Sequence, residues 1–154
     1  MTPQRQAVID AAMSWLKTPY HHRARVKGAG VDCAQILIAV YTEAGLIEEF
    51  DPGDYPPDWM MHRAEERYLG YVLDRATRVD DPQPGDVALY KVGRCFSHAA
   101  IVVGWPQIIH ASNRDRMVCL ADGTQGWLAG REVQFWRAQG LAPDGAASPI
   151  GGGQ

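Results

Sequence analysis

Two hydrophobic patterns divide this chain, and the change between them constrains its fold more than any other feature. Before residue 80, apolar residues recur at helical spacing, and after the turn signal Pro82-Gln83-Pro84-Gly85-Asp86 short apolar runs of strand length follow one another. Helices followed by consecutive strands are typical of the α+β class. The sequence therefore predicts N-terminal helices packed on an antiparallel β-sheet.

The first predicted helix starts at Thr2 and Pro3 and ends near Thr18, because Pro19 disfavours helical geometry in the residue before it. A basic loop should then occupy residues 19–31. The remaining predicted helices cover residues 33–44 and, after a cap at Asp58, the segment up to Ala76; the predicted strands cover residues 87–91, 98–103, 107–111, 117–120 and 133–137.

Cys33 stands at the predicted start of a strongly apolar helix, directly after Asp32, a favourable N-cap. A thiol at this position lies in the positive end of the helix dipole, which favours the thiolate. The N–H groups of the first turn would also stabilise an oxyanion. The alternative is a buried structural cysteine, because free cysteines are among the most buried residues.

His98 and His110 lie on the two arms of a predicted β-hairpin that bends at Gly104. A ladder symmetric about Gly104 makes the two histidines cross-strand partners, and a register shifted by two makes them diagonal neighbours. One imidazole would accept a thiol proton and the other would orient the first. A zinc site built from Cys33, His98 and His110 is the alternative, although a thiolate held by a helix dipole needs no metal. No metal or cofactor is therefore expected.

The other histidines and cysteines receive simpler interpretations. His21 and His22 are expected at the surface or in a substrate cleft, and His62 in solvent. The three cysteines lack the spacing of a zinc site or a disulfide framework, so reduced thiols are expected, with Cys95 and Cys119 structural. The tryptophans of the second half, Trp127 and Trp136, are expected in the core or at its rim.

A length of 154 residues favours one domain, expected to comprise residues 1–140, followed by a flexible Gly-rich tail over 141–154. The net charge of −3 argues against a nucleic-acid partner. No stretch is long and apolar enough to span a membrane, and no signal peptide precedes the domain, so synthesis in the cytoplasm is expected.

Five short motifs in this order resemble the NlpC/P60 family of papain-like cysteine peptidases, in particular its phage-tail and gene-transfer-agent members. They are Thr18-Pro19-Tyr20, Gly30-Val31-Asp32-Cys33, Gln83-Pro84-Gly85-Asp86-Val87, Ser97-His98-Ala99-Ala100-Ile101-Val102 and Ile109-His110-Ala111. The resemblance implies a papain-like α+β domain in which the cysteine helix packs on the sheet.

The same resemblance implies roles for individual residues. Cys33 would be the nucleophile, His98 the general base and His110 the residue that orients the base, while Tyr20 and Asp32 would line or shape the substrate site. Members of the family commonly cleave the bond between D-γ-glutamyl and a diamino acid in peptidoglycan stem peptides. Peptidoglycan peptides and phage-like tail-tip proteins are thus the expected partners, and a virion-like particle the expected destination.

One departure from the family pattern follows the cysteine, where Ala34-Gln35-Ile36 replaces the common Ser-Gly-Leu. This departure motivates a second hypothesis, a catalytically weak assembly module of a phage-like tail tip. Acyl transfer to or from a lipid or a small amine is a third hypothesis, which the absence of a membrane anchor disfavours.

Overall fold

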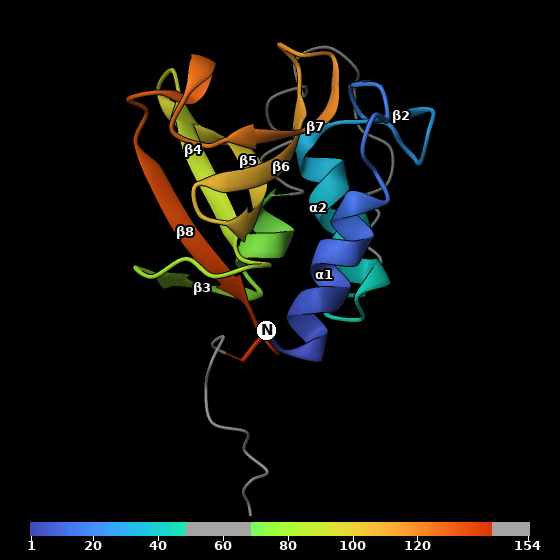
Figure 1. Ribbon diagram of the computed structural model, residues 1–154, viewed down its shortest axis with the longest axis vertical. Helices are drawn as coiled ribbons and strands as arrows, with labels where there is room; N and C mark the ends of the chain where they lie inside the picture. Colours follow the sequence, from blue (N-terminus) through green and yellow to red (C-terminus); the bar gives the residue numbers. More distant parts are fainter. Residues whose placement is uncertain (49–68, 143–154) are drawn as a thin grey trace, which may run out of the picture.

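The computed structural model describes residues 1–48 and 69–142, and a six-stranded antiparallel sheet with helices against it forms its framework (Figure 1). The strand order is β3-β8-β4-β5-β6-β7. This architecture confirms the predicted α+β class. The strands are β3 (Ala76–Val79), β4 (Val87–Val92), β5 (Cys95–Gly104), β6 (Gln107–Ser112), β7 (Met117–Asp122) and β8 (Val133–Ala138).

Helix α1 (Pro3–Met13) begins as predicted, because the Thr2 hydroxyl accepts a hydrogen bond from the Arg5 N–H at 3.2 Å. The predicted end near Thr18 is wrong. After Met13 the chain continues in turns, and the Ser14 hydroxyl donates to the Ala11 carbonyl at 2.6 Å, where it competes with the helical ladder. Lys17 then adopts a φ of 71°, which no α-helix accommodates.

Helix α2 (Cys33–Glu43) lies within one residue of its predicted bounds. The Asp32 side chain caps its first turn, and Gly45, with a φ of 77°, follows its C-cap residue Ala44. Both signals act over a few neighbouring residues, which is why the sequence located this helix correctly.

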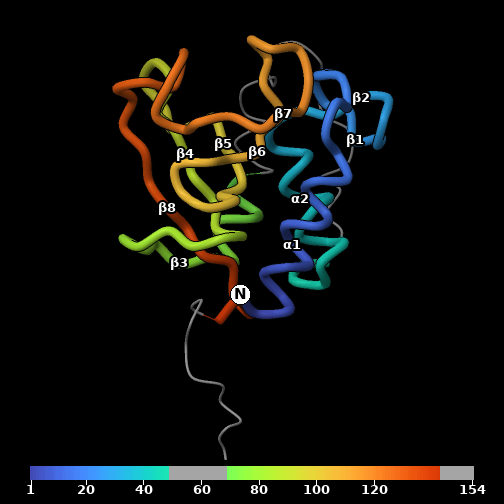
Figure 2. The backbone as a smooth tube through the Cα atoms, viewed as in Figure 1, coloured from blue at the N-terminus to red at the C-terminus, as the bar shows by residue number. Residues whose placement is uncertain are grey.

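Three strands lie where the sequence predicted none. Strands β1 (Arg25–Val26) and β2 (Gly30–Val31) form a two-stranded ribbon inside the predicted basic loop, beside the start of α2 (Figure 2). Strand β3 contains Ala76, which was predicted to be helical. Of the predicted third helix, residues 69–73 are helical, while its first part and His62 lie outside the described residues.

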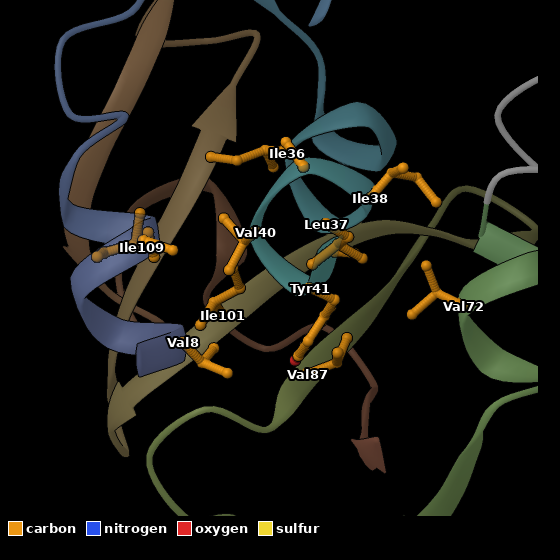
Figure 3. Close-up of a cluster of buried hydrophobic side chains, with 14 of the residues drawn as sticks. Val8, Ile36, Leu37, Ile38, Val40, Tyr41, Val72, Val87, Ile101 and Ile109 are labelled. Carbon is orange, nitrogen blue, oxygen red and sulfur yellow. The ribbon is translucent and has the colours of Figure 1, made fainter. Parts of the chain in front are cut away.

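Two clusters of buried side chains hold the sheet from opposite sides. The larger cluster centres on α2, whose residues 33–41 are all buried, and Figure 3 shows α2 side chains meeting those of α1 and the sheet. Fully burying one such Leu or Ile stabilises the fold by about 1.5–3 kcal/mol, so this cluster fixes α2 on the sheet. The members of the smaller cluster are Ala88, Tyr90, Ala100, Val102, Ile108 and Leu128, with Trp127 packed against them.

The end of the described chain is joined to its beginning. Leu141 is buried, and the Ala142 carbonyl accepts a hydrogen bond of 2.8 Å from Nε of Arg5. Arg5 also forms an ion pair with Asp86, which a second arginine, Arg137, contacts at 2.8 Å. No helix in residues 1–48 and 69–142 has the length and apolar character needed to cross a membrane.

Candidate active site

Cys33 lies at the first position of α2 and is 4% exposed. Its Sγ donates to the carbonyl oxygen of Ser97, the residue before His98, at 3.8 Å. Asp32 Oδ1 accepts the N–H groups of Ala34 and Gln35 at 3.1 and 2.8 Å. These two donors are engaged by the cap and are therefore not available to an oxyanion.

Asp32 acts on the loop as well as on the helix. Its second oxygen, Oδ2, accepts the Arg23 N–H at 2.7 Å. Burial raises the pKa of this carboxyl, and its backbone hydrogen bonds oppose the shift. Asp32 thus ties the loop before the cysteine to the start of α2.

His98 on β5 and His110 on β6 are in direct contact. Nε2 of His98 and Nδ1 of His110 lie 2.8 Å apart, which is a hydrogen bond between the two rings. The ring centroids are 5.1 Å apart in an edge-on arrangement. The structure therefore brings together the two imidazoles that the hairpin predicted.

The sequence left two hairpin registers open, and the structure has the one shifted by two residues from symmetry about Gly104. Ile101 pairs with Ile109, because the ladder is irregular between Val102 and Gly104. The two histidines are consequently diagonal neighbours across β5 and β6, the arrangement of the alternative register, and their rings bridge the longer separation.

Burial keeps both imidazoles neutral. It lowers the pKa of His98 to about 3, with a smaller contribution from His110, and it lowers the pKa of His110 to about 4 against the opposing charge of Asp115. A neutral imidazole is the form that accepts a proton. At neutral pH His98 is therefore in the form that can accept a proton from a thiol.

Two aromatic residues from the smaller cluster enclose the histidine pair. The Trp127 ring meets His98 edge-on with centroids 4.8 Å apart and stacks on His110 at 6.0 Å. The Tyr90 ring lies 6.1 Å from His98. Sequence reasoning placed Trp127 only in the core or at its rim, because no local pattern links this tryptophan to strands β5 and β6.

Cys33 and His98 line the same cleft, which has a volume of about 960 Å³. Tyr20, His21 and His22 line it too, whereas Asp32 is buried and is not among the described residues that line it. None of the described residues that line the cleft is acidic, and Arg94 and Arg114 make its walls cationic. The sequence offered no sign of these two arginines, which reach the cleft from loops. The other lining residues are Leu69, Val92, Cys95, Ser97, Asn113 and Trp127.

The remaining cysteines are not core residues. Cys95 is exposed and lines the cleft, and Cys119 is half-buried with its Sγ 3.8 Å from Asp115 Oδ2. Burial and the Asp115 carboxylate raise the pKa of Cys119 to about 11, so this thiol is a poor nucleophile at neutral pH.

The zinc alternative does not fit the histidine geometry. His98 and His110 use their facing nitrogens on each other, which leaves no place for an ion between them. Within residues 1–48 and 69–142, the residues that cluster with metal-ligand spacing are His110, Asp115 and Cys119, a set without Cys33.

The NlpC/P60 family model matches residues 17–137, which include the cysteine helix and both histidine strands. The chain belongs to the NlpC/P60 family. The match confirms the family resemblance drawn from the motifs. A comparison with curated proteins found no match to this chain.

Solved NlpC/P60 structures share the fold at low sequence identity. NlpC1 from Trichomonas vaginalis is 18% identical with a TM-score of 0.64, and the match covers 88% of this chain and 43% of NlpC1. The peptidoglycan hydrolase RipB from Mycobacterium tuberculosis is 18% identical with a TM-score of 0.58, covering 87% of this chain and 64% of RipB.

RipD from Mycobacterium tuberculosis, described as a non-catalytic NlpC/p60 domain protein adapted to peptidoglycan binding, is 16% identical with a TM-score of 0.57. The match covers 89% of this chain and 98% of RipD. The chain thus spans less than half of NlpC1 and nearly the whole of RipD. These neighbours include both a hydrolase and a non-catalytic domain.

Proposed function

We propose that this protein is a cysteine peptidase of the bacterial cell wall that hydrolyses an amide bond in peptidoglycan stem peptides. The observation that carries the proposal is the placement of Cys33, at the start of α2, in one cleft with His98, whose far side is hydrogen bonded to His110. A nucleophile, a neutral base and a residue that orients the base are the parts of an acyl-transfer site.

The proton path follows from the hydrogen bond between the histidines. Nε2 of His98 is engaged by His110, so Nδ1 accepts the Cys33 proton as the sulfur bonds to the amide carbon. The imidazolium then protonates the leaving amine while the carbon–nitrogen bond breaks. Water then loses a proton to His98 and attacks the thioester carbon. The carbon–sulfur bond breaks, and His98 returns its proton to the Cys33 sulfur, which restores the thiol. General base catalysis of this kind contributes about 10²–10⁴-fold to the rate.

The charge of the cleft favours an acidic peptide. Arg94 and Arg114 line it, and none of the described lining residues is acidic. Stem peptides contain a free carboxylate beside the γ-glutamyl linkage, which guanidinium groups bind well. We therefore propose the bond between D-γ-glutamyl and a diamino acid as the one hydrolysed.

The second candidate function is peptidoglycan binding without turnover, which the structural likeness to RipD supports. The replacement of the family's Ser-Gly by Ala34-Gln35 motivated this alternative in the sequence. Both residues are buried, at 1% and 3% exposure, and neither is among the described residues that line the cleft. The departure therefore leaves the cleft open, which favours the hydrolase.

We also propose that the protein acts on a phage-like particle, in contact with tail-tip proteins. The support is the similarity of its motifs to phage-tail and gene-transfer-agent members of the family. Particles purified from the producing cells and analysed by peptide mass spectrometry should contain this chain in a fixed ratio to tail proteins. Its absence from particles would contradict this assignment and leave the chemistry unaffected.

Synthetic stem peptides, incubated with purified protein and analysed by mass spectrometry, test the reaction. The wild-type protein should cleave the γ-glutamyl bond, and Cys33→Ala should not. Cys95→Ser is the matched control, because it removes the other thiol of the same cleft, and it should still cleave. Cleavage by Cys33→Ala would overturn the proposal, and binding of intact peptides without cleavage would favour the second candidate.

A further inference from the structure

A cluster of three metal-ligating side chains lies beside His110, where β6 pairs with β7. One ring nitrogen of His110, one carboxylate oxygen of Asp115 and Sγ of Cys119 all lie within 4.8 Å of one another. The strand register explains the cluster: His110 on β6 pairs with Cys119 on β7, so both side chains share a face. Asp115 comes from the turn that joins the two strands.

An unpartnered nitrogen points to a ligand at this cluster. Nδ1 of His110 is bonded to His98, whereas Nε2 is buried and has no hydrogen-bond partner among the described residues. The residue is 1% exposed, so bulk water does not satisfy this nitrogen. Buried polar atoms in native proteins nearly always have a partner, and a cation bound through the Nε2 lone pair would supply one.

The spacing and the chemistry of the donors suit zinc. A Zn–S bond of about 2.3 Å and a Zn–O bond of about 2.1 Å at the tetrahedral angle place the two ligand atoms about 3.6 Å apart. Cys119 Sγ and Asp115 Oδ2 are 3.8 Å apart. A thiolate and an imidazole disfavour Mg²⁺ and Ca²⁺, which prefer oxygen ligands.

The carboxylate of Asp115 is already oriented for this role. The Ser112 hydroxyl donates to Asp115 Oδ2 at 2.7 Å and accepts the Asp115 N–H at 3.1 Å. Such outer contacts fix metal ligands in productive positions. Asp115 is exposed and Cys119 half-buried, which gives an ion a path from solvent.

We propose that His110, Asp115 and Cys119 bind Zn²⁺ or a similar divalent cation, and that the bound ion reverses the hydrogen bond between His98 and His110. The ion takes the Nε2 lone pair of His110 and displaces the thiol proton of Cys119 to solvent. Three protein ligands leave the fourth position to water.

The reversal follows from counting the protons on two neutral imidazoles. Without the ion, His110 carries its proton on Nε2 and accepts from Nε2–H of His98, whose Nδ1 is free to take the Cys33 proton. With the ion on Nε2, His110 carries its proton on Nδ1 and donates it to His98. The His98 proton then sits on Nδ1, and the base has no lone pair towards the cysteine. This inhibition rests on the proposed peptidase function, whereas the metal site does not.

Cobalt spectroscopy on the full chain tests the site without any turnover. Co²⁺ titrated into the protein should give a thiolate-to-cobalt charge-transfer band, which Cys119→Ser should abolish and which Cys33→Ala and Cys95→Ser should retain. Zn²⁺ should displace the cobalt, and Cys119→Ser should weaken Zn²⁺ binding at least about 100-fold, because even outer-shell partners are worth about 10–100-fold. A band that survives Cys119→Ser, or the absence of any band, would overturn the site.

Histidine nitrogen NMR tests the coupling independently of the reaction. Zn²⁺ should move the His98 proton from Nε2 to Nδ1 in the wild-type protein and leave it in place in Cys119→Ser. If peptide cleavage is established, Zn²⁺ should also inhibit the wild-type protein at least 10-fold more than Cys119→Ser, each relative to its own zinc-free rate. If the His98 proton does not move in the zinc-loaded protein, the proposed reversal of the hydrogen bond is overturned. If the protein cleaves no peptide, the cobalt titration and the NMR experiment still decide the metal site and the reversal.

Discussion

Nε2 of His98 lies 2.8 Å from Nδ1 of His110, so the orientation of the proposed base depends on the tautomer of its neighbour. His110 is buried, and its ring stacks on that of Trp127 with centroids 6.0 Å apart. The pair therefore acts as a unit. In the proposed mechanism His110 does not contact Cys33 directly and acts on it only through His98.

Substitution of His110 should separate positioning from packing. His110→Asn keeps an oxygen that accepts from His98, whereas His110→Leu leaves the base without its partner. We expect His110→Leu to lower kcat/KM by about 10²–10⁴-fold and His110→Asn to lose less. Stem-peptide kinetics measure both, with thermal unfolding as the check on folding, and equal losses in two folded variants would contradict the positioning role.

Acid should destabilise the protein through the buried histidines. Their folded-state pKa values, about 3 for His98 and about 4 for His110, lie below the unfolded value of 6.5, so the unfolded state binds more protons between these limits. Stability conferred by the neutral imidazoles is thus present above pH 6.5 and is lost as the pH falls.

Between pH 7 and pH 5, we expect the free energy of unfolding to fall by about 2 kcal/mol for each buried histidine. Urea denaturation at both pH values measures the change. His110→Asn removes one titrating group and should roughly halve the fall. A wild-type protein equally stable at both pH values would show that the histidines are not neutral in the native state.

Asp86 should be the most sensitive charged residue of the described fold. Its carboxylate is fully buried between Arg5 and Arg137, at 3.1 and 2.8 Å. Asp86→Asn leaves the buried Arg5 charge without compensation and should cost about 3–5 kcal/mol. The exposed Asp10, bonded to Gln6, provides the control: Asp10→Asn should change stability by less than about 0.5 kcal/mol in the same denaturation experiment.

The two helix caps offer a matched pair of substitutions. Asp32→Ala and Thr2→Ala each remove a side-chain acceptor from a first turn and should each cost about 0.5–2 kcal/mol. Only Asp32 also holds the Arg23 N–H beside the cleft. Asp32→Ala should therefore lower peptidase activity in conditions where both variants remain folded, and Thr2→Ala should not. Equal activities would show that the Asp32 contact does not shape the site.

Features encoded by neighbouring residues were predictable from the sequence. Asp32 and Cys33 placed the start of α2 correctly, because a cap and an apolar run act over one or two turns. The two histidines were brought together correctly for the same reason, since a hairpin joins adjacent segments. Their register was not predictable, because the irregularity after Val102 has no sequence signature of its own.

Features that depend on distant partners were missed. Strand β3 pairs with β8, which lies about sixty residues later, and its own residues carry no strand pattern. Cys119 was interpreted only as a structural cysteine, because its pairing with His110 depends on the register of β6 and β7. Trp127 and Arg114 likewise reach the site from a short helical turn and a loop that tertiary packing positions.

The proposed nucleophile Cys33 and the proposed base His98 lie on different elements, α2 and β5, sixty-five positions apart, and they line one cleft because the helix packs against the sheet. Neither element has to unfold for the thiol and the imidazole to separate, since a small slippage between the two layers suffices. Loss of tight side-chain packing precedes loss of secondary structure in many loosened states. On heating or mild denaturation, the proposed peptidase activity should therefore be lost while circular dichroism still reports intact helices and strands.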